Sequence, residues 1–175
     1  TVRACLTSGD YDRADAVLAR LEKAGFLSVR TFNKILNHWS TQGTVESAER
    51  AEHILQQMKQ LAQTDRPELK PDAYAYTYCA AAWVQVDNSQ SCERVWKLCE
   101  QVQEENLEPN KYYFKLTIPF LAKSNDRDMI FRAESLLQDM ESSKNPNIQP
   151  LRMHYGPVVS ALCLVGEGAR AAAVL

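Results

Sequence analysis

The residue types best suited to metal or nucleophilic chemistry are cysteine and histidine, and their spacing does not assemble a site. No Cys-x-x-Cys pair occurs, and His38, His53 and His154 form neither His-x-x-x-His nor His-Glu-x-x-His. Cys92 and Cys99 lie seven residues apart in one predicted helix, and we expect no metal site there. All the cysteines lie among apolar residues, which predicts reduced, buried thiols in an intracellular compartment. They are Cys5, Cys79, Cys92, Cys99 and Cys163.

Catalytic motifs are equally scarce. No nucleophile–base pair, paired-carboxylate motif or glycine-rich phosphate loop stands out in the sequence. The segment "GEGAR" at 166–170 has two glycines but no following Lys-Ser/Thr, so it predicts a turn between helices. We therefore expect neither catalysis nor a cofactor in these 175 residues.

Basic and acidic residues are unevenly distributed along the chain. The net charge of −2 and the isoelectric point near 5.9 argue against nucleic-acid binding through bulk charge. Yet 29–40, 73–86, 111–124 and 152–165 hold six basic residues and no acidic ones, whereas the rest holds 14 basic and 22 acidic residues. Two explanations stay open. The segments could form a positive face for a phosphate backbone, or acidic residues could simply favour the first turns of the other helices.

These segments belong to a repeated pattern. An arginine is followed by a small or apolar residue, and then by apolar residues three, four and seven positions further on. Those offsets place the side chains on one stripe of a helix. The copies begin at Arg13, Arg50, Arg94, Arg132 and, in shortened form, Arg170.

A second predicted helix, marked by a lone aromatic residue, precedes most copies. Polar turns separate the two helices of a pair, and a proline stands near the end of each unit. The marking aromatics are Phe32, Tyr76, Phe114 and Tyr155. Seven residues after the first three come Trp39, Trp83 and Leu121. We predict that these equivalent positions pack one helix of a pair onto the other.

The pattern predicts an all-α fold, a right-handed or otherwise curved α-solenoid of stacked antiparallel helix-turn-helix repeats. One pair cannot bury its apolar stripe alone, so its neighbours must cover it. No apolar run approaches the roughly 18 residues of a membrane span, so we expect no membrane insertion. We predict a single array over 1–175, and because it ends inside an apolar pattern we interpret it as part of a longer protein. The predicted units are about 1–28 (partial), 29–72, 73–110, 111–151 and 152–175 (partial).

The segments "TFNKILN", "YAYTYCAAAW" and "KYYFKLTIPFL", which follow "LS", "KPD" and "EPN", resemble pentatricopeptide repeats. The resemblance covers almost the whole chain, although the units here are longer than those of the family. It implies single-stranded RNA binding in a groove lined by the first helices, with one base per repeat. It also implies a mitochondrial or plastid protein with a role in RNA metabolism.

The same resemblance implies roles for individual residues. A base would be read by the residue after the marking aromatic together with the last residue of the unit. This implies uracil for Asn33 with Asp72, adenine for Thr77 with Asn110, and no familiar base for Lys115 with Leu151. The residues that would flank the bases are Arg30, Tyr74, Tyr112 and Met153. Phosphate attraction is expected from Lys34, Lys123 and Arg152.

Simpler explanations stay open for these residues. Asp72 and Asn110 directly precede predicted helices and suit N-caps whatever they bind. Asn33 could be a solvated polar residue, and Tyr74 and Tyr112 could pack against adjacent units. For the whole chain, the alternative function is a protein-binding scaffold within a large assembly such as an organellar ribonucleoprotein, which the irregular unit lengths favour.

Overall fold

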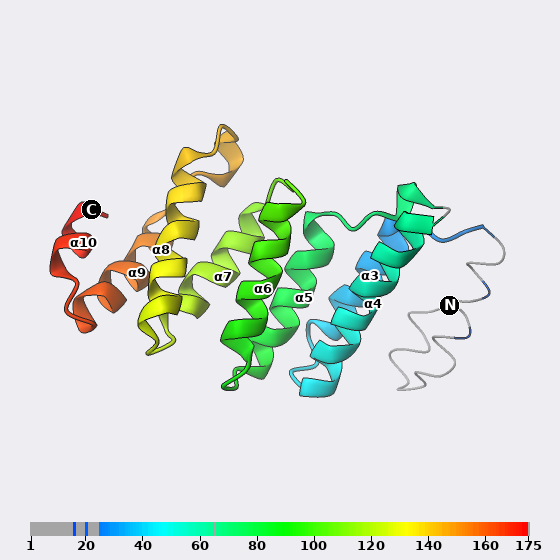
Figure 1. Ribbon diagram of the computed structural model, residues 1–175, viewed down its shortest axis with the longest axis horizontal. Coiled ribbons are helices and arrows are strands. Elements are labelled where there is room, and N and C mark those ends of the chain that lie inside the picture. Colours follow the sequence, from blue (N-terminus) through cyan, green and yellow to red (C-terminus); the bar gives the residue numbers. More distant parts are fainter. Residues whose placement is uncertain (1–15, 17–19, 21–24, 65, 175) are drawn as a thin grey trace. The chain divides into compact units, whose positions relative to one another are not determined.

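The structure, a computed structural model, describes residues 16, 20, 25–64 and 66–174 (Figure 1). Within these residues every regular element is a helix, which confirms the all-α prediction. The chain divides into two compact units, a first unit from Thr1 to Val86 and a second unit from Asp87 to Leu175. None of the described helices is both long and apolar enough to cross a membrane.

The part of the first unit described from residue 25 onward contains the helices α3 (Val29–Trp39), α4 (Val45–Thr64) and α5 (Ala73–Val86). A tight turn joins α3 to α4, and Gly43 in that turn has a φ of +69°, in the left-handed region that favours glycine. The short 3₁₀ helix η1 (Pro67–Leu69) packs against α4 on the way to α5. Helix α5 packs against both α3 and α4 (Figure 1), and α3 also contacts α4.

The core of the first unit contains the aromatic residues that the sequence pattern placed there. Trp39 and Trp83 are at most 4% exposed, which confirms them as core residues, and the marking aromatics Phe32 and Tyr76 are buried beside them. The indole N–H of Trp83 donates to Oε1 of Glu52 at 2.7 Å, so burying this ring leaves no donor unpaired. The predicted stripe of α4 is buried as well: Ala51, Ile54, Leu55 and Met58.

The second unit contains five helices and a 3₁₀ turn. They are α6 (Ser91–Glu104), α7 (Lys111–Ala122), α8 (Arg127–Ser142), η2 (Pro146–Ile148), α9 (Arg152–Leu164) and α10 (Gly168–Ala173). Helix α7 packs against α8 and α9, α6 contacts α7 and α8, and α9 contacts α10. The predicted apolar stripes of α6 and α8 are buried throughout: Val95, Leu98, Cys99, Val102, Ala133, Leu136, Leu137 and Met140. Leu121 of α7 is fully buried, as predicted.

Helices α3, α5, α7 and α9 begin at the residues predicted to open the first helices. The pattern copy that begins at Arg13 lies outside the described residues. One prediction was wrong: Cys163 is exposed, whereas Cys79 and Cys99 are buried and Cys92 is partly buried. The buried stripe of α9 runs through Val158, Ala161 and Leu162, and Cys163 lies beside that stripe rather than on it.

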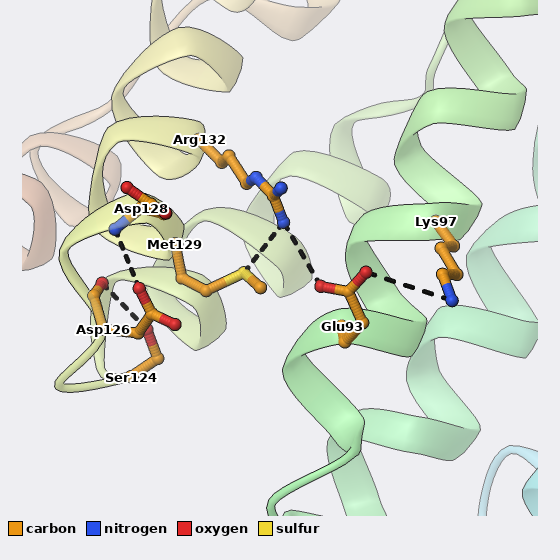
Figure 2. Close-up of polar contacts among 7 residues, drawn as sticks. All are labelled: Glu93, Lys97, Ser124, Asp126, Asp128, Met129 and Arg132. Carbon is orange, nitrogen blue, oxygen red and sulfur yellow. Dashed lines mark hydrogen bonds and ion pairs between the residues drawn. The ribbon is translucent and has the colours of Figure 1, made fainter.

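Two of the recurring arginines connect successive second helices of the second unit. Arg132 on α8 approaches α6, with its Nη1 3.4 Å from Oε2 of Glu93 and its guanidinium 4.9 Å from the ring centroid of Trp96. Figure 2 shows Arg132 pointing toward Glu93, whose other oxygen lies 3.9 Å from Nζ of Lys97. Because these charged groups are about one-third to one-half exposed, water weakens their attraction.

Arg170 on α10 makes the equivalent connection to α8. Its Nη2 lies 2.5 Å from Oε2 of Glu134, and its guanidinium is 3.9 Å from the ring centroid of Phe131. The side chain of Glu134 is only 6% exposed, so this ion pair is far better shielded from water than that of Arg132. A recurring sequence feature therefore has a recurring structural role, with the carboxylate buried in one copy and exposed in the other.

Candidate nucleic-acid interface

The first two turns of α3 present a polar face opposite the core. Arg30, Asn33, Lys34 and Asn37 have offsets of three, four and seven, so they share one side of the helix. Ser28 fixes the start of α3, because its Oγ accepts a hydrogen bond from the backbone N–H of Thr31 at 3.3 Å. The opposite face is buried and consists of Phe32, Ile35, Leu36 and Trp39.

Asp72 reaches this polar face from the chain segment that leads into α5. Its Oδ1 accepts from the backbone N–H of Ala75 at 2.9 Å, which makes Asp72 the N-cap predicted for that helix. Its carboxylate also accepts from Nδ2 of Asn33, at 3.1 Å to Oδ1 and 3.0 Å to Oδ2. The two residues that the resemblance assigns to one base thus meet, although they lie 39 positions apart in the sequence.

The segment before Asp72 is anchored on both of its sides. Nη2 of Arg66 donates to the carbonyl oxygen of Leu27 at 3.3 Å, just ahead of α3. Leu69 in η1 is fully buried. These contacts hold Asp72 in register with α3, so the Asn33–Asp72 pair is set by the fold of the first unit.

The amide of Asn33 is only partly satisfied by Asp72. Both carboxylate oxygens accept from Nδ2, and Oδ1 of Asn33 is buried without a hydrogen-bond partner among the residues that the structure describes. A buried acceptor left without a donor costs about 1–3 kcal/mol. A ligand that donates a hydrogen bond to this amide would recover part of that cost.

A hollow of about 420 Å³ lies beside the Asn33–Asp72 pair. This volume is within the roughly 300–1,000 Å³ of ligand pockets in proteins. Helix α3 supplies Val29, Arg30, Asn33, Lys34 and Asn37, and Asp72 and Tyr78 complete the lining. Arg30 and Lys34 are exposed, so the hollow combines two cations at the surface with an amide–carboxylate pair deeper in.

The other predicted residues of the first unit differ in accessibility. Tyr74 is 52% exposed, and its ring centroid lies 6.5 Å from that of Tyr78 with the planes tilted by 33°. Thr77 is fully buried, and its Oγ1 donates to the carbonyl oxygen of Ala73 at 2.6 Å. This burial argues against base contact by Thr77, and we leave it out of the proposed interface.

In the second unit the predicted residues lie at the starts of α7 and α9 and at the end of α7. Asn110 is the N-cap of α7, with its Oδ1 accepting from the backbone N–H of Tyr113 at 2.9 Å. Tyr112 is 48% exposed and lies three positions before the exposed Lys115, so the two share a side of α7. Lys123, also exposed, forms the C-cap at the other end of that helix. Two exposed residues open α9: Arg152 and Met153.

Sequence reasoning missed three residues that line the hollow: Val29, Asn37 and Tyr78. Two of them could have been found from helical spacing. Asn37 lies four residues after Asn33, and Tyr78 four residues after Tyr74, so each shares a face with a residue that was singled out.

Within the described residues, no three side chains of the His, Cys, Asp and Glu types come together in a way that could hold a metal ion. The polar side chains that line the hollow offer hydrogen bonds and charge. No protein-family model and no curated protein matches the chain.

Proposed function

We propose that the chain binds single-stranded RNA and that the hollow between α3 and the start of α5 holds one base. The observation that carries the proposal is the Asn33–Asp72 pair, with hydrogen bonds of 3.1 and 3.0 Å beside a hollow that also contains Arg30 and Lys34. Resemblance to pentatricopeptide repeats motivates the same pair. The pair's geometry supports the proposal independently of that resemblance.

Uracil is the base that this amide suits best. Its edge carries one N–H donor flanked by carbonyl acceptors, and a carboxamide offers the complementary acceptor and donor. Asp72 engages only the amide nitrogen of Asn33, so its buried Oδ1 is the acceptor that a base N–H would engage once the side chain turns toward the hollow. Asp72 would act as the positioning residue, fixing the orientation of Asn33 through a charge-assisted hydrogen bond.

Charge around the hollow supports the presence of a phosphate backbone beside the base. Arg30 and Lys34 are exposed on the lining helix, and α3, α5, α7 and α9 contain no Asp or Glu. Neutralising phosphates supplies most of the sequence-independent affinity of such proteins. We extend the proposal to a solenoid in which these helices line one groove, in a protein of organellar RNA metabolism.

The test is RNA binding measured by fluorescence anisotropy at several salt concentrations. Uridine-rich and cytidine-rich 12-mers are compared on the wild-type protein and on Asn33→Ala. A lost base contact is worth about 1–3 kcal/mol of discrimination, so we expect the preference for the uridine-rich strand to fall roughly tenfold. Lys34→Gln should lower the slope of log affinity against log salt by about 0.7, the value for one phosphate on a single strand.

Matched controls are available at exposed positions that do not line the hollow. Gln56→Ala on α4 and Lys144→Gln in the turn after α8 remove similar groups and should leave affinity and slope unchanged. Absence of salt-sensitive binding, or equal uridine preference in the wild type and in Asn33→Ala, would refute the proposal.

A protein-binding scaffold is the second candidate function. It is favoured by the burial of Thr77, which argues against the second of the two readable base contacts. Protection of the acidic residues Glu49, Glu52 and Glu93 from carboxyl modification by a partner protein, with none by RNA, would favour the scaffold.

A further inference from the structure

A second hollow, of about 440 Å³, lies wholly within the second unit. It is formed where the end of α6 and the segment after it meet the start of α7, the end of α8 and η2. Its position and lining separate it from the hollow of the first unit. Nothing in the proposed RNA-binding function uses it.

The lining is largely apolar and well fixed. Val102, Phe114, Leu136 and Ile148 each contribute to it, and each is at most 4% exposed. Such side chains can pack against an aliphatic chain but cannot form a hydrogen bond with it.

Tyr113 adds a buried polar group to this lining. It is 1% exposed, and among the described residues its buried hydroxyl has only the Cys99 thiol, a weak hydrogen-bonding group, as a neighbouring partner. Burial, the Cys99 thiol and the Asp139 carboxylate raise the pKa of Tyr113 well above its usual value, so the hydroxyl stays neutral and can accept a hydrogen bond. Tyr113 and Asp139 both line the hollow.

The charge at the rim is negative. Asp139 and Glu108 line the hollow, and no lysine or arginine does. Oδ2 of Asp139 accepts from Nε2 of Gln103 at 2.9 Å, and Oε1 of Glu108 accepts from Nδ2 of Asn145 at 2.8 Å. Both donors are neutral amides, so they orient the carboxylates without cancelling their charge. Phosphate would be repelled here.

We propose that this hollow receives a lysine side chain from a partner protein. Its ammonium group would lie between Asp139 and Glu108 near the Tyr113 hydroxyl, and its methylene groups would pack along Val102 and Leu136. A compact ammonium with three donors suits separate acceptors on separate groups. Arginine suits the site less well, because its planar fork prefers both oxygens of one carboxylate, and one oxygen of each is already engaged.

The first experiment uses small probes on the isotope-labelled chain. N-acetyl-lysine methylamide is titrated while the NMR signals of Tyr113 and its neighbours are followed. We expect saturable shifts confined to the hollow. The Nε-acetylated form of the probe and the equivalent arginine probe should bind at least tenfold more weakly. Equal binding of the acetylated probe would overturn the proposal, because the site would then recognise only the aliphatic stem.

Variants and a competing ligand complete the test. Asp139→Asn with Glu108→Gln should weaken the lysine probe at least tenfold, and Glu104→Gln, an exposed carboxylate outside the hollow, should not change it. If the double variant binds as well as the wild type, the proposal fails. Tighter binding of spermidine than of the lysine probe would also overturn it, since the occupant would then be a free polyamine.

Discussion

Replacing Arg170 by alanine should destabilise the second unit by about 2 kcal/mol. The substitution leaves the 6%-exposed carboxylate of Glu134 without its charged partner, a loss of about 1–3 kcal/mol. It also removes the guanidinium from the face of Phe131, 3.9 Å away, worth about 0.5–1 kcal/mol at a partly exposed site. Arg170 is itself 43% exposed, so water can reach Glu134 after truncation, which holds the total in the lower part of the combined range.

Arg132→Ala is the matched comparison on α8. Glu93 is half exposed and is readily solvated when Arg132 is lost, so the ion pair contributes only about 0.2–1 kcal/mol. Stacking on Trp96 at 4.9 Å adds about 0.5–1 kcal/mol. We therefore expect the loss of stability from Arg170→Ala to exceed that from Arg132→Ala by roughly 1 kcal/mol. In 1 M salt, where exposed charges are screened within about 3 Å, only the loss from Arg132→Ala should become smaller.

Urea unfolding followed by circular dichroism, in 0.1 M and 1 M salt, measures both free energies of unfolding. Hydrogen exchange of the α9 and α10 amides detects opening confined to that end of the unit. Replacing Arg170 and Glu134 together by leucine should restore most of the lost stability, because no buried charge is then left unpaired. An Arg170→Ala effect equal to or smaller than that of Arg132→Ala would refute the reasoning from burial.

Three further predictions concern packing, pH and thiol reactivity. Leu137→Ala, at a site 1% exposed, should cost about 2–5 kcal/mol in urea unfolding, whereas Leu164→Ala, at a site 86% exposed, should change stability by less than about 0.5 kcal/mol. Burial lowers the pKa of His154 below its usual 6.5, so the unfolded chain binds the proton more readily than the folded chain. The free energy of unfolding should therefore fall as the pH drops through 6.5, and His154→Gln should make it depend less on pH in this range. A disulfide reagent at pH 8 should modify the exposed Cys163 in the folded protein, whereas Cys99, whose pKa burial raises to about 12, should react only on unfolding, as mass spectrometry of digested peptides can show.

The helices and their core could be predicted from sequence because both follow from spacing. Offsets of three, four and seven must place side chains on one stripe, and a stripe of Ile54, Leu55 and Met58 is stable only when covered. The aromatic residue near the start of each first helix adds a second, independent mark. Where both marks coincide, helix starts such as Val29 and Lys111 agree with the structure.

The hollow of the first unit could be predicted only in part. The resemblance paired Asn33 with Asp72 and named Arg30 as a base-flanking residue, and Lys34 was expected to attract phosphate; all four line the hollow. The accessibility of Thr77 could not be predicted, because a threonine in a helix can satisfy its own hydroxyl through the carbonyl oxygen four residues earlier. Such a residue tolerates burial as easily as exposure, and its neighbours in space decide which occurs.

Equal spacing explains why the arginine contacts recur although their partners do not. Arg94, Arg132 and Arg170 follow one another at intervals of 38 residues. The guanidinium groups of Arg132 and Arg170 each contact the residue one position before and the residue two positions after the preceding arginine. In α6 these positions hold Glu93 and Trp96; in α8 they hold Phe131 and Glu134. The glutamate and the aromatic residue have exchanged positions between the two helices, yet the guanidinium group contacts both of them in each case. The spacing therefore determines which positions meet, and the burial of each position determines how much the charge contributes.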